Sequence, residues 1–178
     1  MSEVTAEQAH LLVHNVFLNL LRSESRTTRS VLAAVPNSNL DYRPDPCARS
    51  ANELLRHIAG GDNLFLKTVI DGAFVPGSVK VPEDTKTPQQ VAEWYEREHE
   101  KNLDAVGKLS GEQLIRIVDF RGAFQRPAWF FLQMGLVHAV HHRGQLSTYL
   151  RAMGGKVPAI YGESYDSAEA KKAGQPVV

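Results

Sequence analysis

The sequence has one cysteine and no excess of charge of either sign. Because Cys47 stands alone, no disulfide can form within the chain, and metal or redox sites built from paired cysteines are excluded. A single thiol suits a reducing compartment. Lys plus Arg and Asp plus Glu number 20 each, so the formal net charge is +0. Without a global positive field, we expect no nucleic-acid partner and no attraction to anionic lipid.

Long apolar runs are also absent. No run approaches the roughly 18 residues that a membrane-spanning helix needs. The first ten residues, MSEVTAEQAH, have neither the basic start nor the apolar centre of a secretory signal. We therefore expect a soluble, cytoplasmic protein without a membrane partner. A length of 178 residues suits one domain with one sizeable core, and we predict a single domain over 1–178 with its core at about 5–162.

Apolar residues recur at helical spacing in four long segments. Helix start signals stand at Thr5, Ser50 and Thr87-Pro88, and a glycine pair at 154–155 is a stop signal. The stretch LIRIVDF has partial alternation and predicts a short extended piece, and the polar tail from about Ser164 is expected to pack loosely. The predicted helices are 5–35, 50–71, 87–109 and 127–153.

Four long helices in one small domain predict an all-α four-helix bundle with long connections. The connection between the second and third helices has about 16 residues and spans about 50 Å when extended. A second helix of about 22 residues is only about 33 Å long. The link is therefore long enough to return along the whole bundle, which permits, but does not require, up-down-down-up topology.

The stretch HAVHHRGQL, residues 138–146, concentrates three histidines in five positions. His138 and His142 share one helical face, and imidazoles at i and i+4 can converge on one metal ion. A third ligand would come from a facing helix, where His57 is the obvious candidate. The alternative is that these are hydrogen-bonded core histidines or part of a solvated polar face. His141 is rotated away from this face and is interpreted as a bystander.

The remaining histidines point to no site. His10 and His14 have polar surroundings and are expected at the surface, and His99 in the charge run EREHEK is expected to be solvated. Two glycines, Gly60 and Gly61, interrupt the second helix at a cost of about 1 kcal/mol each relative to alanine. Gly61 shares the face of His57, so its missing side chain would leave room for a substrate; close packing of two helices is an equally good explanation.

Two segments resemble the DinB-like superfamily of metal-binding four-helix bundles: LLRHIAGGDNLFL (54–66) and HAVHHRGQLSTYLRAMGGKVPAIYG (138–162). The approach LDYRPDPCARSANELLRHIA is also similar, and the resemblance covers about residues 10–162. It implies that His57, His138 and His142 are the metal ligands. It also implies up-down-down-up topology and a homodimer.

Three neutral imidazoles leave a divalent ion with an open position, which is typical of catalytic rather than structural sites. Zinc fits this ligand set best, and nickel, iron and manganese are compatible with it. Glu53 and Gln145 are candidates to orient the ring N–H groups, unless they only cap or pack. Tyr149 is a candidate to donate toward a bound ligand. Arg143, with Arg151, is a candidate to bind a carboxylate, or else a structural ion-pair partner.

The resemblance also implies an activity. Characterised relatives include mycothiol-dependent maleylpyruvate isomerases and bacillithiol-dependent S-transferases, so we expect a metal-dependent enzyme that transfers or adds a low-molecular-weight thiol to an electrophilic small molecule. Cys47 need not take part. Two alternatives stay open: a hydrolase in which the metal activates a water with Glu53 as general base, and a non-catalytic, stress-associated bundle that keeps the metal for stability.

Overall fold

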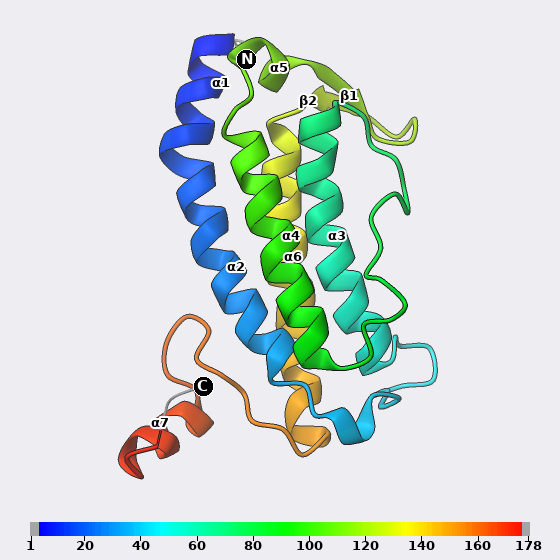
Figure 1. Cartoon of the computed structure of the whole chain (residues 1–178), viewed down its shortest axis with the longest axis vertical. Helices are drawn as coiled ribbons and strands as arrows, with labels where there is room; N and C mark the ends of the chain where they lie inside the picture. The colour runs from blue at the N-terminus through cyan, green and yellow to red at the C-terminus, as the bar shows by residue number, and fades with distance from the viewer. Residues whose placement is uncertain (1–3, 176–178) are drawn as a thin grey trace.

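The computed structural model describes residues 4–175, which form four long helical segments and a small hairpin (Figure 1). The first segment is one continuous rod made of α1 (Ala6–Leu12), the π-helical turn η1 (Val13–Phe17) and α2 (Leu18–Ala33). The expected all-α bundle is confirmed. Its other elements are η2 (Asn37–Asn39), α3 (Ala51–Asp71), α4 (Pro88–Val106), α5 (Gly111–Ile115), β1 (Ile117–Asp119), β2 (Gln125–Pro127), α6 (Phe130–Ala152) and α7 (Tyr165–Lys172).

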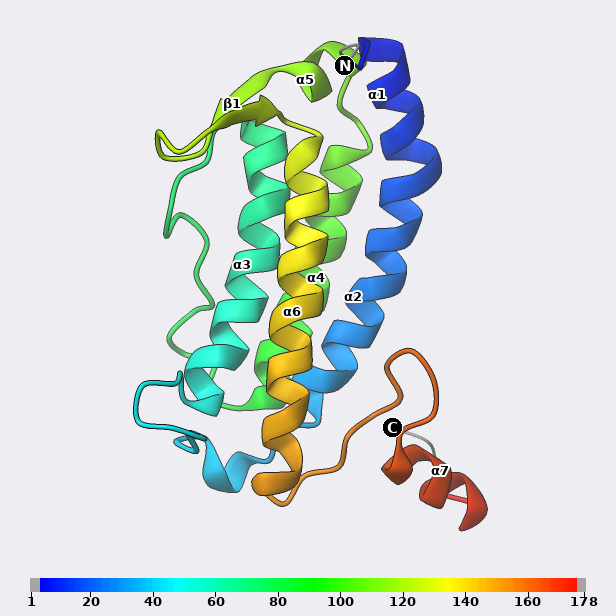
Figure 2. The same cartoon turned by 180° about the vertical axis from the view of Figure 1, so that it is seen from behind.

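The topology is the one that the long connection permitted. In Figures 1 and 2, α1 and α2 run away from the N-terminal end of the bundle, and both α3 and α4 run back toward that end. The chain between them, residues 72–87, descends along the outside of the bundle. Helix α6 then runs away from the N-terminal end again and packs mainly against α3. This up-down-down-up arrangement places the first part of α3 beside the second half of α6.

The helix starts follow from local chemistry. Thr5, Ser50 and Thr87 each accept a hydrogen bond from a backbone N–H three residues on, and the side chain at that third position bonds back in each case. These capping boxes satisfy N–H groups that have no partner inside the helix. The expected starts of the first three helices are therefore correct.

A hairpin separates α5 from α6. The extended piece predicted in LIRIVDF is β1, which pairs antiparallel with β2 through Val118 opposite Arg126. Pro127, expected to open the last helix, instead ends β2, and α6 begins three residues later at Phe130. The reason is that Ala128 N–H donates to the carbonyl of Arg116, which continues the hairpin contact past the proline.

The tail that follows Ser164 forms a short helix, α7. Ser164 caps it, and Asp166 in its first turn pairs with Arg151 of α6 at 3.0 Å. Figures 1 and 2 both show α7 lying apart from the four long helices. The tail is thus helical but makes few contacts with the bundle core.

The buried core consists of two apolar clusters separated by a polar layer. One cluster includes Leu32, Ile58 and Leu146, and the other includes Leu21 and Phe131. Between them in sequence along each of the four long helical segments lie buried polar residues. We call this set the polar layer: Thr28, Asp62, Asn63, His99 and Arg143. Most buried polar groups in proteins have hydrogen-bond partners, so a network of interacting side chains is expected in this layer.

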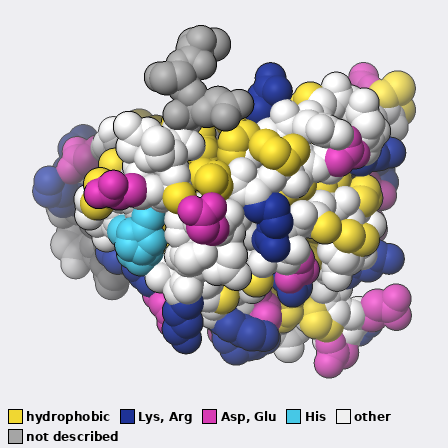
Figure 3. All heavy atoms as spheres, turned by 90° about the horizontal axis from the view of Figure 1, so that it is seen from above, with side chains coloured by type: hydrophobic (Ala, Val, Ile, Leu, Met, Phe, Trp, Pro, Cys, Tyr) yellow, Lys and Arg dark blue, Asp and Glu magenta, His cyan; other side chains and the backbone are white. Residues whose placement is uncertain are grey.

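The surface adds two observations. Seen end-on (Figure 3), basic and acidic side chains are intermixed with hydrophobic ones, so that no broad area of one sign covers this face. Among the residues that the structure describes, no helix combines the length and the hydropathy that crossing a membrane would require.

Candidate metal centre

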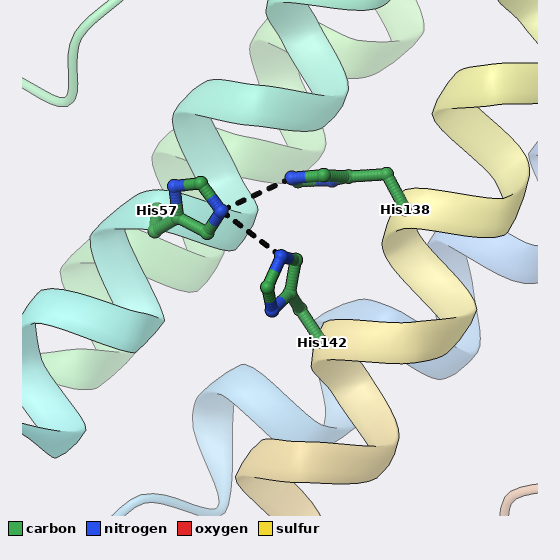
Figure 4. Close-up of side chains that lie close together, drawn as sticks. All are labelled: His57, His138 and His142. Atoms are coloured by element: carbon green, nitrogen blue, oxygen red, sulfur yellow. Dashed lines mark hydrogen bonds between the residues drawn. The ribbon is translucent and has the colours of Figure 1, made fainter. Parts of the chain in front are cut away.

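The three histidines singled out by the sequence come together at the edge of the polar layer. His57 stands in the second turn of α3, and His138 and His142 stand one turn apart on α6. Figure 4 shows their rings turned toward one another across the gap between the two helices. One ligand nitrogen from each lies within 4.8 Å of the others, and all three residues are half-buried.

The separations fit a common ion. Nε2 of His57 lies 3.1 Å from Nε2 of His138 and 3.1 Å from Nε2 of His142. Two nitrogens bound to one zinc ion at its usual bond length and tetrahedral angle lie about 3.3 Å apart. The cluster is therefore compatible with a metal site without any rearrangement of the helices.

Hydrogen-bond partners assign the tautomers of two rings. Nδ1 of His138 lies 3.1 Å from Oδ1 of Asp62, and Nδ1 of His142 lies 3.0 Å from Oε1 of Gln145. Each Nδ1–H therefore donates, which leaves a lone pair on each Nε2. The single proton that His57 can carry on Nε2 serves only one of these two lone pairs. A cation satisfies all three nitrogens at once, so the donor set fits a metal ion better than it fits a hydrogen-bond network.

Burial favours the neutral form of two of the rings, those of His57 and His142, and the neutral form is the one that binds metals. Burial lowers the pKa of His57 to about 4, with further lowering from the charges of His138, Arg49 and His142. Burial also lowers the pKa of His142, although its hydrogen bond to Gln145 opposes this change. Metal ligation at neutral pH would therefore not require either ring to lose a proton first.

The contacts around Gly60 and Gly61 explain why glycine stands at these two positions of α3. A β-carbon at this position would lie 2.5 Å from Cε1 of His138, and one on Gly60 would lie 3.3 Å from the carbonyl oxygen of Val79. The close approach of α3 to α6 is thus the explanation that applies, and the room at Gly61 is taken by an imidazole. Both glycines also line the cleft described below.

Asp62 is the residue that reasoning from the sequence missed. It is 4% exposed, and it accepts hydrogen bonds from His138 and from the hydroxyl of Tyr95, at 3.3 Å. Burial raises the pKa of this carboxyl, and its bonds to His138 and Tyr95 oppose that rise. Metal-bound histidines usually donate their second N–H to a carboxylate or carbonyl. Asp62 takes the role expected of Glu53.

Glu53 and Tyr149 bond to groups outside the histidine cluster. The carboxylate of Glu53 accepts from the Ser50 N–H in the capping box and pairs with Arg43 at 2.9 Å. It therefore faces the start of α3 rather than a ring nitrogen, because the cap and the ion pair use both of its oxygens. The hydroxyl of Tyr149 donates to the carbonyl of Arg49 at 3.3 Å. Of the candidates to orient the rings, Gln145 is placed as expected.

Arg143 belongs to the interior of the bundle. It is 1% exposed and forms an ion pair with Glu24 at 2.7 Å, and it also donates to Thr28 and to the hydroxyl of Tyr161. Arg151 pairs with Asp166 of α7. Of the two interpretations of these arginines, a structural ion-pair partner fits both.

The other histidines divide between surface and core. His141 is exposed, with its ring 4.7 Å from that of His142, and it stays outside the cluster. His10 is exposed and stacks on the half-buried His14. His99, expected to be solvated, is instead 4% exposed and packs beside Tyr95. The charge run misled because its charged residues occupy the outer face of α4 while position 99 faces inward.

Two hollows in the surface share the histidine cluster. A cleft of about 580 Å³ is lined by His57, His138 and Gly61 together with Arg56 and Lys80. A second hollow, a groove of about 410 Å³, is lined by His138, His142 and apolar side chains, including Phe130, Met134 and Val137. Phe65 and His138 border both hollows. Volumes of this size suit small organic ligands.

Comparisons with known proteins agree with this architecture. The model of the DinB family matches residues 1–175. The uncharacterized protein YjoA of Bacillus subtilis is 31% identical over 143 residues, which cover 79% of this chain and 90% of that protein. Its crystal structure, described as a DinB-like protein, has a TM-score of 0.68 at 26% identity and covers 83% of this chain and 99% of that one. A DinB-like protein from Bacillus cereus has a TM-score of 0.67 at 24% identity, covers 82% of this chain and 95% of its own, and supports the fold.

Proposed function

The chain belongs to the DinB family, and from this membership we propose that it is a metal-dependent enzyme whose ion is held by His57, His138 and His142. The proposed reaction transfers or adds a low-molecular-weight thiol to an electrophilic small molecule. The observation that carries the proposal is the convergence of three Nε2 atoms, of which two carry lone pairs fixed by partners at Nδ1.

The ligand set favours zinc, with nickel, iron and manganese as alternatives. When bound, such a cation lowers the pKa of a coordinating thiol enough to deprotonate it near neutral pH. The protein's own contribution is to orient two of the rings: Asp62 accepts from His138, and Gln145 accepts from His142. Cys47 lies exposed in the connection before α3 and has no part in this scheme.

Two hollows that both border His138 suit a reaction with two substrates. The cleft carries the positive charges of Arg56 and Lys80, with Glu83 as its acidic residue, and we assign it to a thiol that bears a carboxylate. Arg56 donates to the carbonyls of Val81 and Pro82, so it holds the wall of the cleft in place. The groove is mostly apolar, and we assign it to the body of the electrophile.

The hydrolase alternative has less support. A hydrolase needs a general base near the ion. Glu53, the candidate for that role, is used by Ser50 and Arg43, and Asp62 is used by His138 and Tyr95. The non-catalytic alternative shares the metal site and differs only in having no turnover, so it is separated by experiment.

The metal site is tested by elemental analysis of the purified protein. We expect close to one divalent ion per chain in the wild type and a loss of most of it in His57→Ala and in His142→Ala. His141→Ala is the matched control, because it removes an exposed imidazole next to the cluster without removing a ligand. Unchanged metal content in the two ligand variants would refute the assignment.

The thiol is tested in a Co²⁺-substituted sample. Addition of 3-mercaptopropionate should produce a sulfur-to-cobalt charge-transfer band, whereas propionate should not. Absence of the band with this thiol and with 2-mercaptoethanol would contradict thiol transfer. A large gain in thermal stability from the metal, without turnover on a panel of electrophiles, would favour the non-catalytic bundle. The homodimer stays a prediction, which sedimentation equilibrium tests.

A further inference from the structure

We propose that Asp62 is a positioning residue for this centre: together with Tyr95 it fixes the tautomer and orientation of His138, so that this ring presents an Nε2 lone pair to His57 and His142. The proposal concerns one of the three proposed ligands, His138, and the buried carboxylate of Asp62 in the polar layer. Its metal-binding consequence rests on the proposed function, but the tautomer itself does not.

Both carboxylate oxygens of Asp62 are engaged. Oδ1 lies 3.1 Å from Nδ1 of His138, and Oδ2 lies 3.3 Å from the hydroxyl of Tyr95. A carboxylate held at both ends cannot turn without losing one bond. Because Tyr95 is on α4 and His138 on α6, Asp62 of α3 ties together three helices.

The backbone of α3 restricts the same ring from a second direction. The space over Gly61 is filled by the Cε1–Nε2 edge of His138, and the ring of Phe65 lies 5.4 Å away, centroid to centroid. The imidazole therefore rests against α3 on one edge and is held by Asp62 on the other. Rotation of the ring by half a turn would exchange Nδ1 for carbon at Asp62 and break the bond.

His142, the second ring whose tautomer is set by a partner at Nδ1, is held less firmly than His138. The partner of His142 is the neutral amide of Gln145, whereas His138 donates to an acidic side chain whose side-chain exposure is only 3%. The ionised form of Asp62 accepts a hydrogen bond about twice as strong as a bond between neutral groups. We therefore infer that the orientation of the His138 ring is fixed before a metal binds. Asp62 then matters more to metal binding than Gln145 does.

The first experiment reads the tautomer directly and needs no metal. Two-bond ¹H–¹⁵N correlation spectra of the metal-free protein at pH 7.5, assigned with His138→Gln, should show His138 protonated at Nδ1. The pair Asp62→Leu and Tyr95→Phe, combined so that no hydroxyl is orphaned, should shift His138 toward the Nε2–H form. Asp62→Asn keeps an acceptor and should retain the wild-type tautomer. A wild-type His138 protonated at Nε2 would overturn the proposal.

The second experiment measures Zn²⁺ affinity by competition with a chelator. Loss of such a partner costs about 10–100-fold in metal affinity, and we expect that loss in the Asp62→Leu/Tyr95→Phe protein and a smaller one in Gln145→Ala. Asn63→Leu is the matched control: it is the next residue, equally buried, and bonds to Asn102 and the Ala59 carbonyl rather than to a ligand.

The outcomes separate the two claims. An Asp62 variant that is folded by circular dichroism and binds within threefold of wild type would refute the positioning role, as would an equal loss in Asn63→Leu. If the wild type binds no divalent ion, the proposed function fails and the tautomer measurement alone decides this inference. If the leucine variant does not fold, the wild-type and Asp62→Asn spectra still decide it.

Discussion

The α-carbon of Gly61 faces the imidazole of His138 so closely that a β-carbon there would lie 2.5 Å from Cε1 and 3.0 Å from Nε2. The hydrogen that Gly61 carries in place of a side chain therefore makes space on α3 for the imidazole of His138 on α6. A helix-weakening residue is tolerated at this position because the bundle could not otherwise bring His57 and His138 together.

Gly61→Ala should push the His138 ring away from Asp62 and from His57. Alanine strengthens the helix by up to about 1 kcal/mol, so the variant should fold, yet its Zn²⁺ affinity should fall by about tenfold or more through loss of the ring's partner. Chelator competition measures the affinity and urea unfolding measures the stability. Affinity equal to that of the wild type would show that the ring has more freedom than the contact implies.

Gly144→Ala, on the same helix as His138, should leave metal binding unchanged, in contrast to Gly61→Ala. A β-carbon at Gly144 meets nothing within 4 Å. We expect an increase in the free energy of unfolding of up to about 1 kcal/mol, with unchanged metal content. A destabilised protein would indicate that this face of α6 is covered in solution, for example by a second copy of the chain.

Acid should destabilise the metal-free protein partly through His99. Burial lowers the pKa of His99 from 6.5 to about 4, so between these values the unfolded chain binds a proton that the folded chain does not. Stability is therefore lost as the pH falls from about 6.5 toward 4, by about 3 kcal/mol for this one group. His99→Gln should show a shallower pH dependence in urea unfolding, and His10→Gln, an exposed control, should not. Equal slopes in wild type and His99→Gln would contradict this account.

Arg143 and Arg151 offer a matched pair of ion-pair deletions on α6. Arg143→Met removes the ion-pair partner of Glu24, whose side chain is 14% exposed and still accepts from the Tyr161 hydroxyl, and should cost up to about 3–5 kcal/mol. Arg151→Met removes an exposed pair, with 55% and 21% exposed side chains, and should cost about 1 kcal/mol or less. Urea unfolding of the two variants measures both values. Similar costs would mean that Arg143 is not the structural element that its burial indicates.

Bound metal should stabilise the fold by mass action. A free ion at about 100 times its dissociation constant adds about 2.7 kcal/mol to the free energy of unfolding if it binds only the folded chain. Thermal unfolding with Zn²⁺ and with excess chelator should differ for wild type and coincide for His57→Ala. A shift that persists in the variant would place the ion elsewhere.

Much of the fold and the histidine cluster could be predicted because both depend on local spacing. The i, i+4 pair of His138 and His142 fixes a shared helical face whatever the bundle does, and capping boxes mark where helices start. The β2 strand could not be predicted, because its three residues are extended only through pairing with β1.

Asp62 was missed for a geometric reason. Five positions after His57, it lies about 140° around α3 and therefore on a different face. It reaches the centre through His138 of the neighbouring helix, a contact that no single-helix projection contains. The available signal was an acidic residue within a mostly apolar helical stretch, since such residues are buried only when paired. Glu53 failed as a candidate because its capping box, itself recognisable, already used the carboxylate.

The order of the helices also sets when the centre can exist. His57 and His138 are separated by 81 positions, and α6 is the last of the four long helices. During synthesis, the first imidazole leaves the ribosome long before the other two, so a nascent chain that ends before α6 holds only one of the three nitrogens. If the cluster binds a metal as proposed, capture of the ion is a late event, and the earlier helices find their parallel arrangement without it.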